Sequence, residues 1–112
     1  MKSVYLAGPM RGLPAFNFPA FFEAEERLGD LGWSVVNPAR MDVELDGFDP
    51  EVDPAKTEAF YMRRDLPAVA GCDAIALLPG WEDSSGALKE FQVAVWCGLE
   101  LLDALTGEVL VE

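Results

Sequence analysis

The stretch Asp73-Ala-Ile-Ala-Leu-Leu78-Pro79-Gly80-Trp-Glu-Asp-Ser84-Ser-Gly-Ala-Leu-Lys-Glu90 contains an apolar run, a break and then a helical segment. The apolar run has the length of a buried strand, and Pro79-Gly80 ends it. Ser84 and its neighbours are residue types that cap helices, so we predict a helix from about Gly86 to Cys97. A strand followed by a loop and a helix is the repeating unit of a parallel α/β sheet.

Apolar runs of strand length occur elsewhere in the chain, at residues 3–7, 33–36 and 98–102, and a short fifth candidate lies at 108–111. The alternation of these strands with helical segments predicts an α/β fold with right-handed crossovers. We therefore expect one domain over residues 1–112, a flavodoxin-like or Rossmann-like three-layer sandwich with a mainly parallel sheet of four or five strands.

Two more helices are predicted from the spacing of apolar residues, over 18–31 and 57–70. Thr57 suits the N-cap of the second helix, and Asn17 suits either the N-cap of the first or the turn before it. Pro67 favours a kink or an early end of the second helix. Residues 41–56 are predicted to form a solvated loop, because they include two prolines, a glycine and six acids: Asp42, Glu44, Asp46, Asp49, Glu51 and Asp53.

Charge and composition exclude several classes of function. The net charge is −12, from 20 acidic and 8 basic residues, and a field of that sign repels nucleic-acid polymers. One small phosphate is still acceptable where an arginine and backbone N–H groups converge. The chain has no histidine, and Cys72 and Cys97 lack further ligands, so we expect reduced thiols, no metal site and acid–base chemistry carried by other side chains.

The sequence shows no pattern typical of a signal peptide or a membrane helix. The first apolar run ends after Ala7 at Gly8-Pro9, which is too short for a signal peptide. No run approaches the roughly 20 apolar residues of a membrane helix. We therefore expect a cytoplasmic protein without a membrane partner.

Ligands of open α/β sheets bind beyond the carboxyl ends of the strands, so the loops at 8–12 and 79–86 are the place to search for a site. Glu90 lies one turn into the helix that follows the second of these loops. Its neighbours three and four positions away are Gly86, Ala87, Val93 and Ala94, none of which is a cation. A carboxylate in such a stripe is either exposed to solvent or functional.

Other candidate residues flank the same two loops. Tyr5 lies inside the first strand as a core aromatic or a hydroxyl donor, and Arg11 lies in a Gly-Pro loop as a surface charge or an anion clamp. Ser84, Ser85 and Gly86 can cap the helix or, with its free N–H groups, bind a phosphate. Asp65 follows Arg63-Arg64 and can pair with either arginine or face the sheet edge as an acid.

Four motifs in order resemble the nucleoside 2-deoxyribosyltransferase superfamily: Tyr5-Leu-Ala-Gly8-Pro-Met10-Arg11-Gly12, Tyr61-Met-Arg-Arg-Asp65-Leu, Asp73-Ala-Ile-Ala-Leu-Leu78 and Ser84-Ser-Gly-Ala-Leu-Lys-Glu90. The chain is most similar to the small bacterial and phage members designated DUF4406, over roughly residues 2 to 103. The superfamily contains deoxyribosyltransferases and 2′-deoxynucleoside 5′-phosphate N-hydrolases.

The resemblance implies a function for each motif. Glu90 would attack the anomeric carbon of a (2′-deoxy)nucleoside or its 5′-monophosphate, Tyr5 would orient Glu90, and Asp65 would contact the sugar or protonate the departing base. Gly8, Met10 and Gly12 would line the substrate site, and Arg11 with Ser84 or Ser85 and Gly86 would hold a 5′-phosphate. The resemblance implies no cofactor, and a homo-oligomer.

Of these substrates, a nucleoside monophosphate is favoured, because Arg11 and the Ser84-Ser85-Gly86 turn have the character of a phosphate site. Two alternatives remain open. The protein can be a module that binds a nucleotide or nucleotide sugar without cleaving it. It can also be a phosphoribohydrolase of the cytokinin-activating type, although the Gly-Gly-x-Gly-Thr turn usual in that type is absent.

Overall fold

In a computed structural model that describes residues 2–110, the chain folds around one parallel sheet. The strands are β1 (Ser3–Ala7), β2 (Ser34–Val36), β3 (Ala74–Leu77) and β4 (Glu100–Asp103), in the order β2-β1-β3-β4. All three strand pairs are parallel, with Tyr5 opposite Ile75 at the centre. The predicted α/β class, the parallel sheet and the strand count are confirmed.

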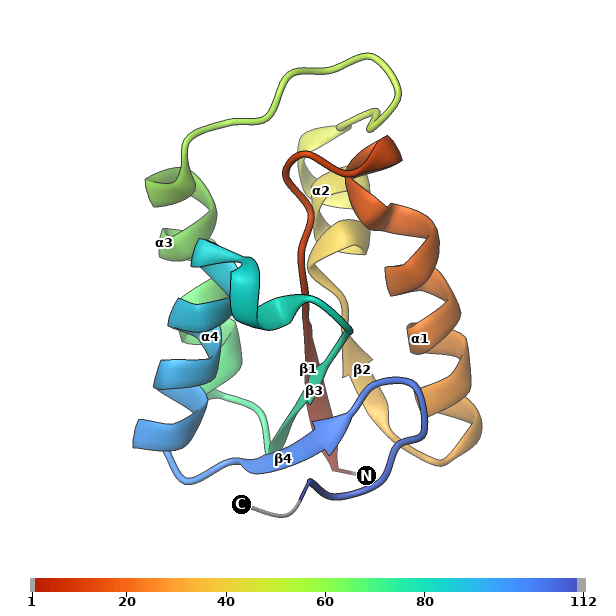
Figure 1. Cartoon of the computed structure of the whole chain (residues 1–112), viewed down its shortest axis with the longest axis vertical. Helices are drawn as coiled ribbons and strands as arrows, with labels where there is room; N and C mark the ends of the chain where they lie inside the picture. The colour runs from red at the N-terminus through yellow and green to blue at the C-terminus, as the bar shows by residue number, and fades with distance from the viewer. Residues whose placement is uncertain (1, 111–112) are drawn as a thin grey trace.

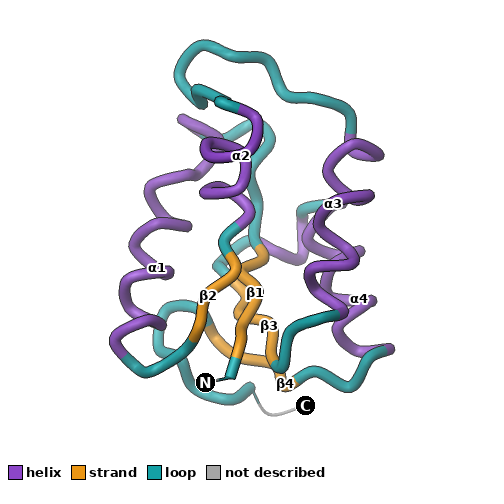
Figure 2. The backbone as a smooth tube through the Cα atoms, turned by 180° about the vertical axis from the view of Figure 1, so that it is seen from behind, coloured by secondary structure: helices purple, strands orange, loops and turns teal. Residues whose placement is uncertain are grey.

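Helices cover both faces of this sheet, which gives the three layers of the predicted sandwich (Figures 1 and 2). Helix α1 (Phe18–Asp30) packs on one face, and α3 (Glu58–Ala70) and α4 (Ser85–Trp96) pack together on the other. Strand alternation explains the partition, because successive side chains point to opposite faces. Val4 and Leu6 join the core under α1, whereas Tyr5 and Ala7 join the core under α3 and α4.

Side-chain caps begin three of the helices. The Thr57 hydroxyl accepts a hydrogen bond from the N–H of Phe60 at the start of α3, as predicted from the sequence. The Ser84 hydroxyl accepts one from the N–H of Ala87 at the start of α4. Such caps satisfy N–H groups that have no partner within the helix and are worth about 1 kcal/mol each.

The prediction of a loop over 41–56 is wrong in its first part, because residues Pro38–Asp46 form helix α2. Asn37 caps this helix by accepting from the N–H of Ala39, and Pro38 occupies the first turn, where its missing N–H costs nothing. The Asn-Pro pair therefore starts a helix directly after β2. The rest of the segment crosses from α2 to α3 above the sheet (Figure 1).

Two smaller predictions also need correction, and a third is decided between its alternatives. The short fifth strand is reduced to a single antiparallel bridge between Leu102 and Val109, and its predicted last residue lies outside the described residues. Helix α3 does not end early at Pro67 but continues to Ala70, since the proline lies in the last turn and removes little of the helix ladder. Of the two roles predicted for Asn17, the structure shows the turn before α1: its side chain makes no cap hydrogen bond, and its amide donates to the Pro9 carbonyl.

The turn before α1 is strained. Ala15, Phe16 and Asn17 have φ angles of 51°, 52° and 61°, a left-handed conformation that costs a residue with a side chain roughly 1–2 kcal/mol. The turn brings the Phe16 ring to 5.4 Å from the Phe48 ring in an edge-to-face contact. We infer that tertiary contacts of this kind, together with the Asn17–Pro9 hydrogen bond, hold the strained turn in place.

Candidate active site

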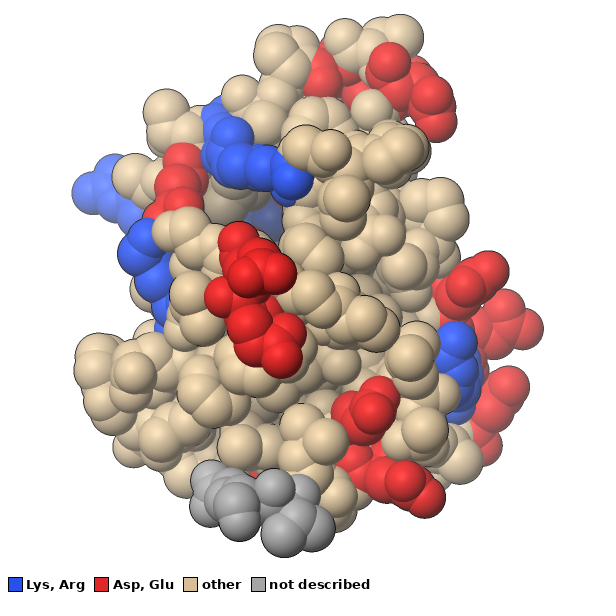
Figure 3. Space-filling model, in the orientation of Figure 1, with Lys and Arg blue, Asp and Glu red and all other residues tan. Residues whose placement is uncertain are grey.

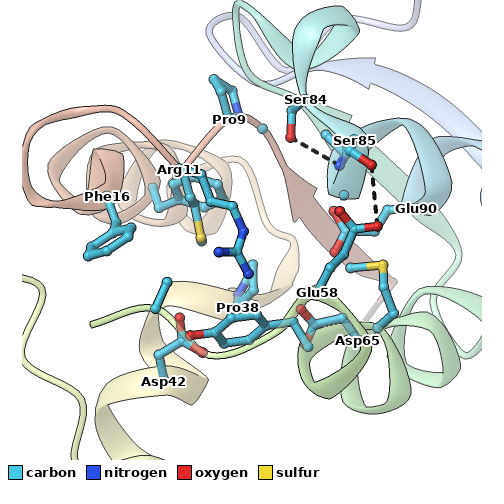
Figure 4. Close-up of a pocket in the computed structure, with 18 of the residues that line it drawn as sticks. Pro9, Arg11, Phe16, Pro38, Asp42, Glu58, Asp65, Ser84, Ser85 and Glu90 are labelled. Atoms are coloured by element: carbon cyan, nitrogen blue, oxygen red, sulfur yellow. Dashed lines mark hydrogen bonds between the residues drawn. The ribbon is translucent and has the colours of Figure 1, made fainter. Parts of the chain in front are cut away.

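A pocket lies at the carboxyl ends of β1 and β3, where the loops after the two strands, α2, α3 and the start of α4 converge. The sequence prediction of the site's place in the fold agrees with this pocket. One side is apolar and is formed by Met10, Phe16, Phe18, Phe21 and Phe48. The opposite side carries charged and hydroxyl groups, and the hollow between them is visible at the upper left of Figure 3 and in the close-up of Figure 4.

Glu90 forms the floor of the polar side. It shares the buried face of α4 with Ala87 and Ala94, and only 6% of its surface is exposed. Tyr5, from the middle of β1, donates a hydrogen bond of 2.6 Å from its hydroxyl to Glu90 Oε2. The carboxylate therefore faces the pocket rather than bulk solvent, and the tyrosine fixes its orientation.

The electrostatic state of Glu90 is unusual for a glutamate. Burial raises its pKa to about 8, against the opposing effects of the Tyr5 hydrogen bond and the Arg64 charge. The nearby charge of Asp65 raises it further. Burial, followed by the charge of Glu90, also raises the pKa of Tyr5 well above its usual value, so the phenol keeps its proton.

Arg64 joins two buried aspartates beside this pair. Its Nε donates to Asp65 Oδ1 at 2.8 Å, and its Nη2 donates to Asp42 Oδ1 at 2.7 Å. Burial raises the pKa of both aspartates, and the arginine opposes that rise. The arginine keeps its proton because the hydrogen bonds to Asp65 and Asp42 raise its pKa despite burial. Asp65 therefore pairs with Arg64 and lines the pocket at the same time.

The loop after β1 contributes three of its four predicted residues to the pocket. Gly8, Met10 and Arg11 line it, whereas Gly12 is exposed and is not among the lining residues. A side chain at Gly8 would collide with the third strand's exit, because its Cβ would lie 2.7 Å from Leu78 Cβ. Arg11 donates to the Lys56 carbonyl, and its guanidinium lies 5.8 Å from the Tyr61 ring.

The start of α4 holds the remaining predicted residues, Ser84, Ser85 and Gly86, at the pocket wall. The Ser84 hydroxyl is engaged as the helix cap. The Ser85 hydroxyl donates to Glu58 Oε1 at 3.2 Å (Figure 4). It also accepts from Lys89 at 2.9 Å. The serines at this helix start are thus already hydrogen-bonded within the protein.

Sequence reasoning missed three charged residues of the pocket. Asp42 was expected in a solvated loop, but it is 3% exposed and bound to Arg64. The sequence predicts Arg64 only as a local partner of Asp65, and no motif includes Glu58. The Asn37-Pro38 helix start is the signal that could have placed Asp42 on a helix, about one turn further along.

Two other classes of site receive no support within residues 2–110. No group of three or more cysteine, aspartate or glutamate side chains there could hold a metal ion. In the same part of the chain, no helix has the length and apolar character needed to cross a membrane.

Comparison with known proteins assigns the chain to a family. Residues 2–103 match the family described as a domain of unknown function, DUF4406. The chain belongs to the DUF4406 family. No curated protein matches the sequence of this DUF4406 chain.

Among solved structures, the DUF4406 chain is similar to a 2-deoxyribosyltransferase from the psychrotolerant bacterium Bacillus psychrosaccharolyticus. The TM-score is 0.62 at 23% identity, and the match covers 88% of this chain and 69% of the other. The fold of the DUF4406 chain is therefore that of a 2-deoxyribosyltransferase.

The pocket of this DUF4406 chain combines an aromatic side with two buried carboxyl groups. Aromatic rings can stack on a planar heterocycle, and carboxyl groups can bind sugar hydroxyls or act in catalysis. The charge of Asp65 contributes to the raised pKa of Glu90, so the protonation of Glu90 depends on the state of Asp65. One group of such a pair can be ionised while the other is protonated.

Proposed function

We propose that this protein cleaves or transfers the N-glycosidic bond of a (2′-deoxy)nucleoside or its 5′-monophosphate, with Glu90 as the nucleophile. The observation that carries the proposal is the buried Glu90 carboxyl, held by Tyr5 at 2.6 Å and facing a pocket with an aromatic wall. The fold shared with a 2-deoxyribosyltransferase supports it.

The reaction follows from the two carboxyl groups. In the first step a Glu90 oxygen bonds to the anomeric carbon as the C–N bond breaks, and the base leaves with the proton that Asp65 supplies. In the second step water or another base attacks the same carbon, the ester to Glu90 breaks, and Asp65 takes up the proton. Two displacements on one carbon give net retention of configuration.

Burial equips the site for the proton transfer. The pKa of Glu90, raised to about 8 by burial, lets the pair keep a proton near neutral pH, which an ordinary pair of exposed carboxylates would lose. The nucleophile must be ionised, so the reactive form has the proton on Asp65. The hydrogen bond that Tyr5 donates stabilises the Glu90 carboxylate, whereas the ion pair with Arg64 opposes protonation of Asp65. The reactive form therefore requires the proton to move from Glu90 to Asp65.

A substrate panel tests the proposal. The protein is incubated with the deoxynucleosides, the ribonucleosides and the 5′-monophosphates of both, and free base is measured by chromatography. We expect base release from deoxy compounds above ribo compounds, because a 2-hydroxyl disfavours the cation-like transition state. Release from ribo compounds alone would support a phosphoribohydrolase instead, and no release from any compound would contradict the proposal.

The role of Asp65 is tested with the leaving group. We expect Asp65→Asn to lower turnover of ordinary deoxynucleosides by about 100-fold or more, the usual contribution of a general acid. A 7-methylpurine deoxynucleoside, whose cationic base leaves without protonation, should lose much less. Equal losses on both substrates, measured as kcat/KM, would show that Asp65 does not protonate the base.

A binding module is a second candidate, and the protonated state of Glu90 favours it. A carboxyl with a pKa of about 8 is mostly neutral at pH 7 and can donate a hydrogen bond to a ligand without attacking it. Calorimetric binding of a panel compound that the wild-type protein never cleaves would support this candidate. Release of base with multiple turnovers would eliminate it.

A further inference from the structure

The polar wall of the pocket is more acidic than a phosphate site should be. Its charged residues are five acids and two arginines: Asp42, Glu58, Asp65, Asp83 and Glu90 against Arg11 and Arg64. Arg64 is already shared between Asp42 and Asp65. Arg11 is therefore the lining cation that remains for a ligand in the described part of the chain, and it is anchored by the Lys56 carbonyl.

Glu58 lies where a phosphate would be expected to bind. It is the first residue of α3, and its Oε1 accepts hydrogen bonds from Ser85 and Lys89 at the start of α4. These bonds lower its pKa, so the side chain carries a full negative charge at neutral pH. Two donors that an anion could use at this helix start, the Ser85 hydroxyl and the Lys89 ammonium, are thus occupied by an anion that belongs to the protein. The hydrogen bond from Ser85 is drawn in Figure 4.

The separation of Ser85 from Glu90 along α4 suits a sugar whose anomeric carbon lies at Glu90 and whose 5′ substituent lies near Ser85. Ser85 and Glu90 are five positions apart on α4, which corresponds to about 7.5 Å along the helix axis. A furanose with its anomeric carbon at Glu90 can therefore direct its 5′ substituent towards Ser85 and Glu58. A 5′-hydroxyl can donate a hydrogen bond to the Glu58 carboxylate, whereas a phosphate dianion cannot and is repelled by it.

We propose that Glu58 makes this site select a neutral nucleoside and exclude the 5′-monophosphate. This inference rests on the proposed function, because it assumes that the sugar binds with its anomeric carbon at Glu90. It reverses the preference for a monophosphate that Arg11 and the Ser84-Ser85-Gly86 turn suggest from sequence alone. The difference arises because Glu58, remote in sequence from both motifs, accepts the hydrogen bond of the Ser85 hydroxyl and places a negative charge beside it.

The test compares two charge-neutralising variants. Glu58→Gln removes the pocket carboxylate, and Glu82→Gln removes an exposed acid nearby that does not line this pocket. For each deoxynucleoside and its 5′-monophosphate, kcat/KM is measured for wild type and both variants. We expect wild type to prefer the nucleoside, and Glu58→Gln to shift the ratio towards the monophosphate by about 10-fold or more. Glu82→Gln should leave the ratio unchanged.

Binding separates failure of this inference from failure of the proposed function. Kd values for the same ligand pairs are measured by calorimetry in a Glu90→Gln background with and without Glu58→Gln, where no turnover occurs. We expect the same shift in the Kd ratio. If wild type releases no base but the Kd ratio shifts, the proposed reaction is wrong and the selection by Glu58 stands.

Other outcomes overturn the inference. It is wrong if wild type cleaves or binds the monophosphate better than the nucleoside. It is equally wrong if Glu58→Gln leaves both ratios unchanged, if Glu82→Gln shifts them as much, or if neither ligand binds.

Discussion

Replacing Glu90 with glutamine is expected to reduce base release by about 1,000-fold or more, because the amide cannot form the covalent bond to the sugar. The variant should still fold and bind, since the amide has the shape of the carboxyl and can accept the hydrogen bond from Tyr5. Intact-protein mass spectrometry of a quenched reaction should show a glycosyl adduct on wild type and none on the variant. Full activity of Glu90→Gln would disprove the mechanism.

The same substitution should stabilise the protein at high pH. The folded-state pKa of Glu90 is about 8 and its ordinary value is 4.5, so between these values the native state holds a proton that the unfolded state has lost. The free energy of unfolding of wild type therefore falls as pH rises through this window. We expect Glu90→Gln to be more stable than wild type by up to about 5 kcal/mol at pH 9, measured by urea unfolding.

That advantage should shrink as pH falls towards 5, where wild-type Glu90 is protonated in the folded state. Tyr5→Phe is the companion variant, because it keeps the ring in the core and removes only the hydroxyl that donates to Glu90. It should raise the pKa of Glu90 and lower activity less than Glu90→Gln does. A Glu90→Gln protein that is less stable than wild type at pH 9 would contradict the assignment of a buried, costly carboxylate.

Replacing Arg64 with methionine is expected to lower the free energy of unfolding strongly. Asp42 and Asp65 are 3% and 4% exposed, and both bind the Arg64 guanidinium. Removing the arginine leaves two buried carboxyl groups without their cation, which typically costs 3–5 kcal/mol. We expect a loss of about 3 kcal/mol or more in the free energy of unfolding at pH 8, measured in urea.

The pH dependence of this loss identifies its cause. Without Arg64 the pKa values of Asp42 and Asp65 rise further, so both accept protons in the folded state as pH falls and no longer need a counter-ion. The loss should therefore be smaller at pH 5 than at pH 8. Adding Asp42→Asn to the variant should restore part of the stability at pH 8.

Arg63→Met is the matched control, since Arg63 is the neighbouring residue on α3 and is exposed. It should change the free energy of unfolding by no more than about 0.5 kcal/mol. An equal loss for both arginines, or a loss that does not depend on pH, would show that the buried cluster is not what Arg64 stabilises.

Local sequence patterns predicted the fold, because each strand and most helices have a recognisable pattern of apolar and turn-forming residues within a few positions. The run Asp73–Leu78 and its Pro-Gly stop describe a buried strand, and the structure places β3 at Ala74–Leu77. Helix α2 was missed because Asn37-Pro38 suits both a strand end and a helix start. Only packing against α1 decides between these outcomes, as the buried Ala39 and Asp42 indicate.

The sequence by itself determined the succession of the four strands and three of the helices, and placed Glu90 in a stripe of small and apolar residues on the last helix, because periodicity is a local property. Only the tertiary structure decided which groups surround that carboxyl. Tyr5 lies 85 positions away from it in sequence, and Asp42 lies 22 positions from Arg64. The pKa values and the acidic wall at Glu58 arise from burial and from charges brought together by chain crossovers, which no local pattern records.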